Sequence, residues 1–322
     1  MKQDKTLRAV AIVGPTASGK TALSLALAAR MPMEIVSCDS MQIYRNLDVG
    51  TAKATPSERA LVPHHMLDIR DACEPYSAAD YGEDAYACAL DISRRDHTPL
   101  FCGGTGLYLD AAVTARHTLA PCADTAIREA LLLEAETEEG KARLYSRLLQ
   151  IDPVSAEAIP MGNIRRVIRA LEIYETTGKT KSALDTESTA LPKRIDLFTV
   201  LLDFEDRSML YDRIEKRVDA MLENGLEAEA RRLYECGLLQ KDTTAGQAIG
   251  YKEFLDYFEG SATLAEVRER IVTATRRYAK RQLTWFHSHD VSRRLFLDTC
   301  TDTIDVVAEK LLPDIRAFLS NE

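Results

Sequence analysis

Hydrophobic residues gather in short runs at the beginning of the chain, and glycine or proline punctuates them. Residues 8–13 form an apolar, β-branched run that stops at Gly14, and residues 34–37 form a second run after Pro32. Between them, residues 21–31 are rich in Ala and Leu, which favour a helix. A strand, a glycine loop, a helix and a second strand in this order are typical of a parallel α/β sheet.

The same pattern returns further along the chain. Residues 99–102 predict a third strand, which breaks at Gly103 and continues as a helix from Leu107. Residues 197–202 and 294–297 are two more strand candidates. We therefore expect an α/β fold, in which helices flank a parallel sheet that carries a phosphate-binding loop.

One long segment lacks strand patterns. Residues 116–192 contain only helical stretches rich in Ala, Leu, Glu and Arg, which proline and glycine separate. We expect an all-helical insertion domain at residues 116–195. It would divide the α/β core into a first part, residues 1–115, and a second part, residues 196–322.

Two long helices are predicted in the last third of the chain. The first covers residues 207–223, where Leu210, Ile214 and Met221 recur at helical spacing. The second covers residues 264–286, and its polar side is unusually basic.

Composition narrows the class of protein. The 322 residues are 46% hydrophobic and 28% charged, which is ordinary for a globular protein and excludes disorder as the main property. No run approaches the roughly 20 apolar residues of a membrane span. The seven cysteines are scattered, without a C-x-x-C pair, so neither a disulfide framework nor a zinc site is expected. We expect a cytoplasmic monomer that does not contact the membrane.

The first glycine loop matches the pattern G-x-x-x-x-G-K-[ST] between a predicted strand and a predicted helix. Such a loop turns backbone N–H groups toward an anion, while Lys20 adds a charge and the Thr21 hydroxyl can hold Mg²⁺. The predicted ligand is a diphosphate or a nucleotide triphosphate such as ATP, and kinases, ATPases and pyrophosphate-releasing transferases all remain possible. The loop consists of Gly14, Pro15, Thr16, Ala17, Ser18, Gly19, Lys20 and Thr21.

Two other predicted strands deliver polar residues to the same edge of the sheet. Asp39 follows the second strand and can act as a general base or hold a metal, or it can simply close a turn. Thr105 lies among three glycines after the third strand, where either a ligand approaches the backbone closely or the chain makes a tight turn.

Arg217 shares the helical stripe of Leu210, Ile214 and Met221, which is expected to face inward. A guanidinium there needs an anionic partner, because an unpaired buried charge is costly. The partner is either a structural carboxylate or a bound pyrophosphate.

Two basic clusters lie away from the glycine loop in a chain whose net charge is −9. Each cluster is either a solvated helix face or a surface for a phosphodiester backbone. The first is Arg165, Arg166 and Arg169, and the second is Arg276, Arg277, Lys280 and Arg281.

Together these motifs resemble the tRNA dimethylallyltransferase family, also called tRNA isopentenyltransferases. The matching motifs occur in family order over nearly the whole chain. They are GPTASGKT at 14–21, DSMQIY at 39–44, GTAK at 50–53, PHHMLD at 63–68, YSAADY at 76–81, GGTGLY at 103–108, RRVIRALE at 165–172, QAIGYKE at 247–253 and RYAKRQLTWF at 277–286.

The resemblance implies transfer of the dimethylallyl group of dimethylallyl diphosphate to N6 of the adenine just 3′ of the anticodon in tRNA. It implies that Asp39 is the general base, that Thr105 reads the adenine, and that Arg217 acts with Lys20, Thr21 and Mg²⁺ on the pyrophosphate. The residues implied to contact the tRNA anticodon stem-loop are Asp39, Ser40, Met41, Gln42, Thr105, Arg128, Arg165, Arg166, Arg169, Gln247, Gly250, Lys252, Lys280 and Arg281.

The chain departs from the family pattern at two positions. Ile164 stands where many relatives carry proline, and His287 stands where arginine is common, so a contact of His287 with RNA is in question. The C-terminal zinc finger of some eukaryotic relatives is missing, which favours the bacterial type. The rival hypotheses are a phosphoryl-transferring kinase, an enzyme that prenylates free adenine nucleotides, and a non-catalytic RNA-binding module.

Overall fold

The computed structural model describes residues 6–114, 124–241 and 243–320. The chain divides into two compact units. Unit 1 comprises Met1–Val113 and Arg194–Glu322, and unit 2 comprises Thr114–Lys193. The insertion domain expected at residues 116–195 corresponds to unit 2, although residues 115–123, including Cys122, lie outside the described part.

Unit 1 is built on a six-stranded sheet in the order β3-β2-β4-β1-β5-β6, and all neighbouring strands are parallel. Since β1 lies between β4 and β5, Val13 pairs with both Gly103 and Leu201. The three loops that follow these strands therefore leave the same edge of the sheet side by side. The strands are β1 (Leu7–Val13), β2 (Met33–Cys38), β3 (His64–His65), β4 (Thr98–Gly103), β5 (Ile195–Asp203) and β6 (Arg293–Phe296).

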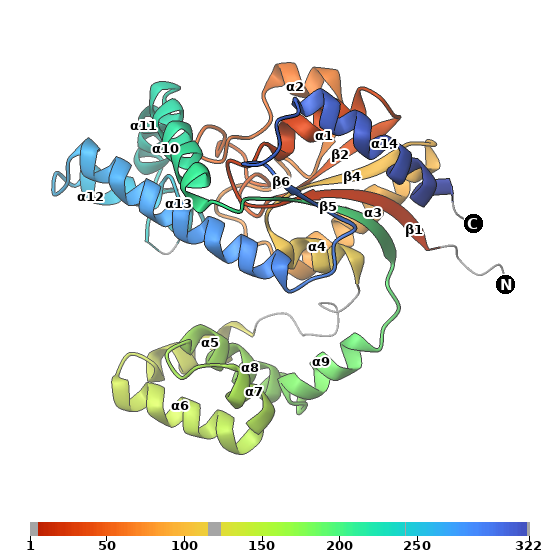
Figure 1. Ribbon diagram of the computed structural model, residues 1–322. Coiled ribbons are helices and arrows are strands. Elements are labelled where there is room, and N and C mark those ends of the chain that lie inside the picture. Colours follow the sequence, from red (N-terminus) through yellow and green to blue (C-terminus); the bar gives the residue numbers. More distant parts are fainter. Residues whose placement is uncertain (1–5, 115–123, 242, 321–322) are drawn as a thin grey trace. The chain divides into compact units, whose positions relative to one another are not determined.

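Helices cover both faces of the sheet because successive strand residues point to opposite sides. In β1, Val10 and Ile12 pack in one core with α1 (Lys20–Ala28) and α14 (Ile304–Ser320). Ala9, Ala11 and Val13 belong to the opposite core, which α3 (Ala78–Arg94) and α4 (Gly106–Val113) close. Figure 1 shows these helix pairs on either side of the strands.

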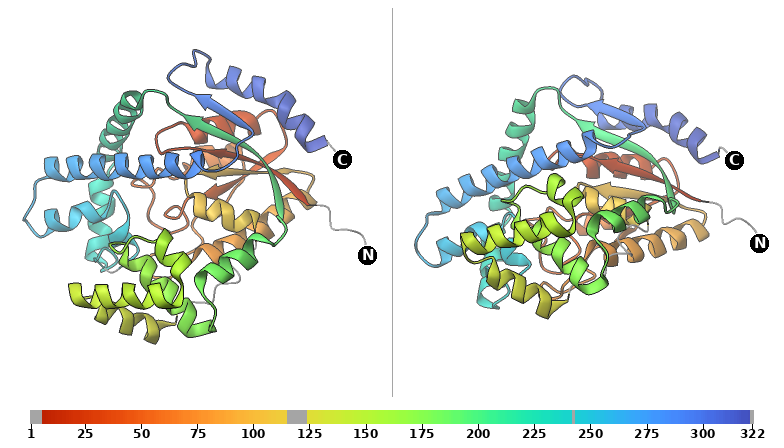
Figure 2. Two further views of the ribbon diagram at one scale, coloured as in Figure 1. Left: turned by 60° about the horizontal axis from the view of Figure 1, so that its bottom comes forward. Right: turned by 90° about the horizontal axis from the view of Figure 1, so that it is seen from below.

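A third core in unit 1 lies among helices beyond the carboxyl edge of the sheet. The long helix α13 begins at a capping box formed by Thr263 and Glu266 and extends unbroken to the sheet (Figure 2). Across the described ranges, no helix is both long enough and apolar enough to cross a membrane. The helices of this part are α10 (Arg207–Glu223), α11 (Leu226–Glu235), η2 (Ala245–Gln247), η3 (Lys252–Phe254), α12 (Leu255–Phe258) and α13 (Leu264–His287). The short helix α2 (Pro56–Leu61) contributes no buried residue.

The described part of unit 2 contains five helices over residues 125–189, and an isolated β-bridge pairs Thr114 with Lys193. Its own small core includes Leu144 and Leu148 from α6 and Val167 and Leu171 from α8. The helices are α5 (Thr125–Glu134), α6 (Glu138–Ile151), α7 (Pro153–Ala158), α8 (Ile164–Thr177) and α9 (Lys181–Thr189).

Candidate active site

The glycine loop between β1 and α1 forms an anion-binding nest. Its backbone is left-handed at Ala17, where φ is 63°, and at Gly19, where φ is 90°. Alternation of right- and left-handed residues turns consecutive N–H groups to the same side, and the start of α1 adds its own free N–H groups. At Gly14 a Cβ would lie 2.5 Å from the Leu202 carbonyl oxygen, so this position requires glycine.

Lys20 projects over this loop and hydrogen-bonds its backbone. Its Nζ donates to the carbonyl oxygens of Gly14, at 3.1 Å, and Pro15, at 2.7 Å. Burial lowers the pKa of Lys20 to about 8, and the nearby Arg217 contributes to the decrease while Asp39 opposes it. The amine therefore lies in a site where an anion would stabilise its charged form.

Asp39 leaves the carboxyl end of β2 and faces the same region. Its Oδ1 accepts the N–H of Met41 at 2.9 Å, which fixes the carboxylate in an Asx turn. Among the described residues, no side chain or N–H donates to the other oxygen, Oδ2. The structure therefore combines two of the alternatives that the sequence leaves open, because Asp39 closes a turn and also presents a carboxylate oxygen to a cavity.

The glycines around Thr105 are required by protein neighbours and do not indicate a ligand. A Cβ would lie 2.0 Å from the Cys38 carbonyl oxygen at Gly103, 1.9 Å from Gln282 Nε2 at Gly104, and 2.1 Å from Trp285 Nε1 at Gly106. The Thr105 hydroxyl accepts the N–H of Ser40 at 3.2 Å, so this loop lies directly beside Asp39.

Arg217 has no carboxylate partner among the described residues. It is partly buried, which lowers its pKa, and its guanidinium donates to the Thr51 carbonyl oxygen at 3.3 Å. Of the two partners that the sequence allows, a structural carboxylate is therefore not observed. An anionic ligand would compensate this charge.

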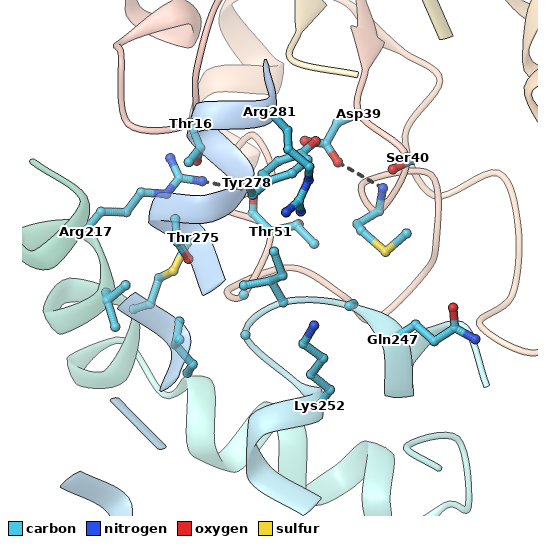
Figure 3. A pocket seen from close by; sticks show the side chains of 18 residues that line it. Thr16, Asp39, Ser40, Thr51, Arg217, Gln247, Lys252, Thr275, Tyr278 and Arg281 are labelled. Atoms are coloured by element: carbon cyan, nitrogen blue, oxygen red, sulfur yellow. Dashed lines mark hydrogen bonds between the residues drawn. The ribbon is translucent and has the colours of Figure 1, made fainter. Parts of the chain in front are cut away.

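Two cavities meet at these residues. One, of about 300 Å³, is lined by the glycine loop with Lys20, Thr21 and Asp39. The other, of about 280 Å³, has a partly apolar wall that includes Val218 and Ile249. Figure 3 shows Asp39, Tyr278 and Arg217 converging on this second cavity from β2, α13 and α10. The residues that line both cavities are Thr16, Asp39, Thr51, Arg217 and Tyr278.

The first cavity offers oxygen donors that suit Mg²⁺. The Thr21 hydroxyl and the carboxylates of Asp39 and Glu58 line it together with the glycine loop. Mg²⁺ prefers oxygen ligands and is usually held by a few protein groups together with substrate phosphates and water. The donor set therefore fits the ion that the sequence leads us to expect.

Several residues implied to contact tRNA lie around the second cavity. Lys252 points toward it from the segment before α12, and Arg281 reaches it from α13 (Figure 3). Gln247 lines it as well. Ser40, Met41 and Gly250 line it too, whereas Gln42 lines the first cavity and accepts a hydrogen bond from Ser37. Lys280 lies exposed on α13.

Other basic residues have protein partners that the sequence does not reveal. In unit 2, Arg128 and Arg169 both pair with the buried carboxylate of Glu172, each at 2.9 Å. Arg165 and Arg166 are exposed at the start of α8. In unit 1, Arg276 pairs with Glu215 and stacks on Tyr211, so the basic face of α13 consists of Arg277, Lys280 and Arg281.

His287 also has a structural partner. Its Nε2 lies 2.8 Å from Oδ2 of Asp203, a carboxylate buried at the end of β5. The contact with Asp203 gives His287 a structural role that does not require RNA.

Sequence reasoning missed two residues of the site. Tyr278 is not among the candidates drawn from the sequence, yet it lines both cavities. Gln282 is 5% exposed and bridges two loops of the site. Gln282 could have been found by the pattern that identifies Arg217, because each is a polar side chain on the inward stripe of a helix.

Comparison with known proteins assigns the family. The family model described as IPP transferase matches residues 42–289, which is more than half of the chain. The chain belongs to this family.

The relatives cover nearly all of this transferase. A protein from Geobacillus thermodenitrificans, named tRNA dimethylallyltransferase, is 47% identical over 88% of both chains. The crystal structure of a tRNA isopentenylpyrophosphate transferase from Staphylococcus epidermidis is 34% identical, with a TM-score of 0.69, over 97% of this chain and 99% of that one. A eukaryotic dimethylallyltransferase described as acting on tRNA is 29% identical, with a TM-score of 0.81, over 98% of this chain and 80% of its own.

Proposed function

We propose that this transferase moves the dimethylallyl group of dimethylallyl diphosphate to N6 of the adenine 3′-adjacent to the anticodon in tRNA and releases diphosphate. The observation that supports this most directly is the position of Asp39. It lines both the cavity of the glycine loop and the cavity with the apolar wall, so a base and a departing anion can meet beside it.

In the proposed reaction Asp39 accepts the proton of the nucleophile. The lone pair of an exocyclic adenine amine is delocalised into the ring, so removal of a proton as the N6–C1 bond forms assists the attack. Oδ2 of Asp39 is the oxygen left for this proton, because Oδ1 holds the Met41 N–H.

The leaving diphosphate gains negative charge as the allylic C–O bond breaks. Lys20, Arg217 and the N–H groups of the glycine loop would stabilise that charge, and all of them line the first cavity. Mg²⁺, held by Thr21 and the substrate, would neutralise further charge on the diphosphate. Arg217, which has no carboxylate partner in the described structure, would gain the diphosphate as its anionic partner.

The adenine has to leave its stack to reach Asp39. Base flipping costs a few kcal/mol, which contacts elsewhere on the RNA offset. The partly apolar wall formed by Val218, Met221, Ile249 and Ile271 provides surface for the prenyl chain or the base. Exposed basic residues, Lys280 and Arg277 among them, would hold the RNA backbone.

The test is mass spectrometry of an anticodon stem-loop incubated with the protein, dimethylallyl diphosphate and Mg²⁺. The expected result is one added C₅H₈ on the adenine that follows the anticodon. Chelation of Mg²⁺ should suppress the product. Transfer of phosphate from ATP without prenyl transfer would favour the kinase hypothesis, and prenylation of AMP in preference to the stem-loop would favour a nucleotide acceptor.

A further inference from the structure

Gln282 connects two loops that are distant in sequence. Its Oε1 accepts the N–H of Thr16 at 2.9 Å, and its Nε2 donates to the carbonyl oxygen of Gly104 at 3.0 Å. Both polar ends of the amide are therefore engaged, and its orientation is fixed. Gln282 is only 5% exposed, so its side chain is buried.

One of the connected loops is the glycine loop, and the other lies directly beside Asp39. Thr16 belongs to the glycine loop after β1, and Gly104 precedes Thr105 in the loop after β4. The pairing between β1 and β4 ends at Val13 and Gly103, so the strand ladder does not hold the loops beyond that point. Gln282 lines the first cavity and bridges them there.

Neighbouring residues of α13 continue this inner face. Tyr278, one turn earlier, lies close to Thr105 and lines both cavities, as Figure 3 shows for the second one. Trp285, one turn later, leaves no space for a side chain at Gly106. Three inward positions of one helix thus contact three consecutive residues of the Thr105 loop.

The outer side of the same helix turn is exposed and basic. Lys280 and Arg281 directly precede Gln282 in sequence, yet both are exposed while Gln282 is buried. The motif at residues 277–286 therefore contains both exposed basic residues and a buried amide.

We propose that Gln282 is a positioning residue of the transfer reaction, which fixes the glycine loop and the Thr105 loop relative to each other. This proposal rests on the proposed function. Reacting groups have to be held close to their productive geometry, and a displacement of about 1 Å can cost on the order of 100-fold in rate. Loss of the bridge would release the glycine loop from the loop that lies beside Asp39.

The decisive variant is Gln282→Met, which keeps the side-chain volume and removes both hydrogen bonds. We expect the single-turnover rate at saturating donor and stem-loop to fall about 10- to 100-fold. The Kd for the stem-loop should change by less than about threefold, because the amide is buried and is engaged by Thr16 and Gly104. Lys280→Met should raise that Kd, and Glu269→Gln, at an exposed position of α13, serves as the neutral control.

A second readout does not depend on catalysis or on a folded variant. Hydrogen exchange of the wild-type chain should show a protected Thr16 amide, and saturating inorganic pyrophosphate should leave that protection unchanged, because Gln282 accepts the bond. In Gln282→Met the same amide should exchange faster.

Three results would overturn the proposal. They are a wild-type Thr16 amide that exchanges as fast as an unbonded loop amide, an unchanged transfer rate in Gln282→Met, and a stem-loop Kd that rises as much as in Lys280→Met. Failure of the wild-type protein to prenylate the stem-loop, with Thr16 protected, would instead refute the proposed function and leave the bridge in place.

Discussion

Three charged side chains determine what the candidate site can bind. Lys20 and Arg217 are both partly buried, both have a pKa below the ordinary value because of that burial, and neither forms an ion pair within the described structure. Asp39 is the carboxylate close to both, yet it is hydrogen-bonded to Met41. Two desolvated cations without counter-ions are costly, so the arrangement favours a multivalent anion.

The lowered pKa of Lys20 predicts a pH dependence of diphosphate binding. Below pH 8 the amine is already protonated in the free protein, so binding requires no proton uptake. A bound anion raises the pKa of the amine, and between the free and bound values the affinity should fall up to tenfold for each pH unit. Calorimetric titration with inorganic pyrophosphate and Mg²⁺ from pH 6.5 to 9.5 measures this decrease.

The matched control for that titration is Lys20→Ala, which should bind more weakly at all pH values. Its affinity should follow only the titration of the ligand. An identical pH slope in the two proteins would show that Lys20 does not titrate in this range.

Substitution of Asp39 separates catalysis from binding. Asp39→Asn preserves an oxygen for the Met41 N–H but cannot accept a proton, so the transfer rate should fall by about 10²- to 10⁴-fold. The Kd for the stem-loop should stay within a few fold, since a base acts chiefly in the transition state. Asp39→Ala should abolish transfer as well. Rapid-quench kinetics with anisotropy titrations measure both quantities, and normal turnover by either variant would exclude Asp39 as the base.

A local sequence pattern identifies a functional residue only where the residue's own helix or strand carries the signal. Arg217 could be identified because its own helix places it on an apolar stripe. Arg276 and Arg128 could not be interpreted in this way, because their partners Glu215 and Glu172 are brought close only by tertiary packing.

At the scale of elements, runs with strong local signals are predicted well and short or weakly periodic ones are not. The helix expected at residues 207–223 coincides with α10, and α13 extends one residue beyond its expected end. Strand β3 has two residues, which is too few to form a pattern. Helix α3 was missed, although Ser77 and Asp80 form a capping box at its start.

The basic face of α13 makes a prediction about RNA binding. Each phosphate contact contributes about 0.7 to 0.9 to the slope of log K against log salt concentration. Lys280→Gln should therefore reduce the slope for the stem-loop by roughly one contact. Arg276→Gln should leave the slope nearly unchanged, because that guanidinium pairs with Glu215, and its partly exposed pair should contribute less than about 1 kcal/mol to stability.

Binding curves measured between roughly 50 and 400 mM salt, where counterion release is measurable, test this difference between the two variants. Equal slopes for the wild type and Lys280→Gln would assign Lys280 to an ordinary solvated surface. A reduced slope for Arg276→Gln would show that the Glu215 pair opens when RNA binds.

At the scale of the whole molecule, charge is unevenly distributed. The net charge is −9, yet the cavities are lined by Lys20, Arg217, Lys252 and Arg281. A protein with this balance attracts anions locally and does not bind nucleic acid indiscriminately.

The order of the strands in the sheet could not be predicted from the sequence. Strand β1 lies between β4 and β5, and both of these neighbours are distant from it along the chain.

The central claim is that one site holds both a departing diphosphate and the base that accepts the proton. The most direct test is a crystal structure with Mg²⁺ and a non-hydrolysable thio analogue of dimethylallyl diphosphate. The account predicts that the diphosphate lies on the N–H groups of residues 17–21 with Lys20 and Arg217 beside it, and that the prenyl C1 points to the Asp39 carboxylate. An analogue bound with its C1 away from Asp39, or bound outside the glycine loop, would contradict it.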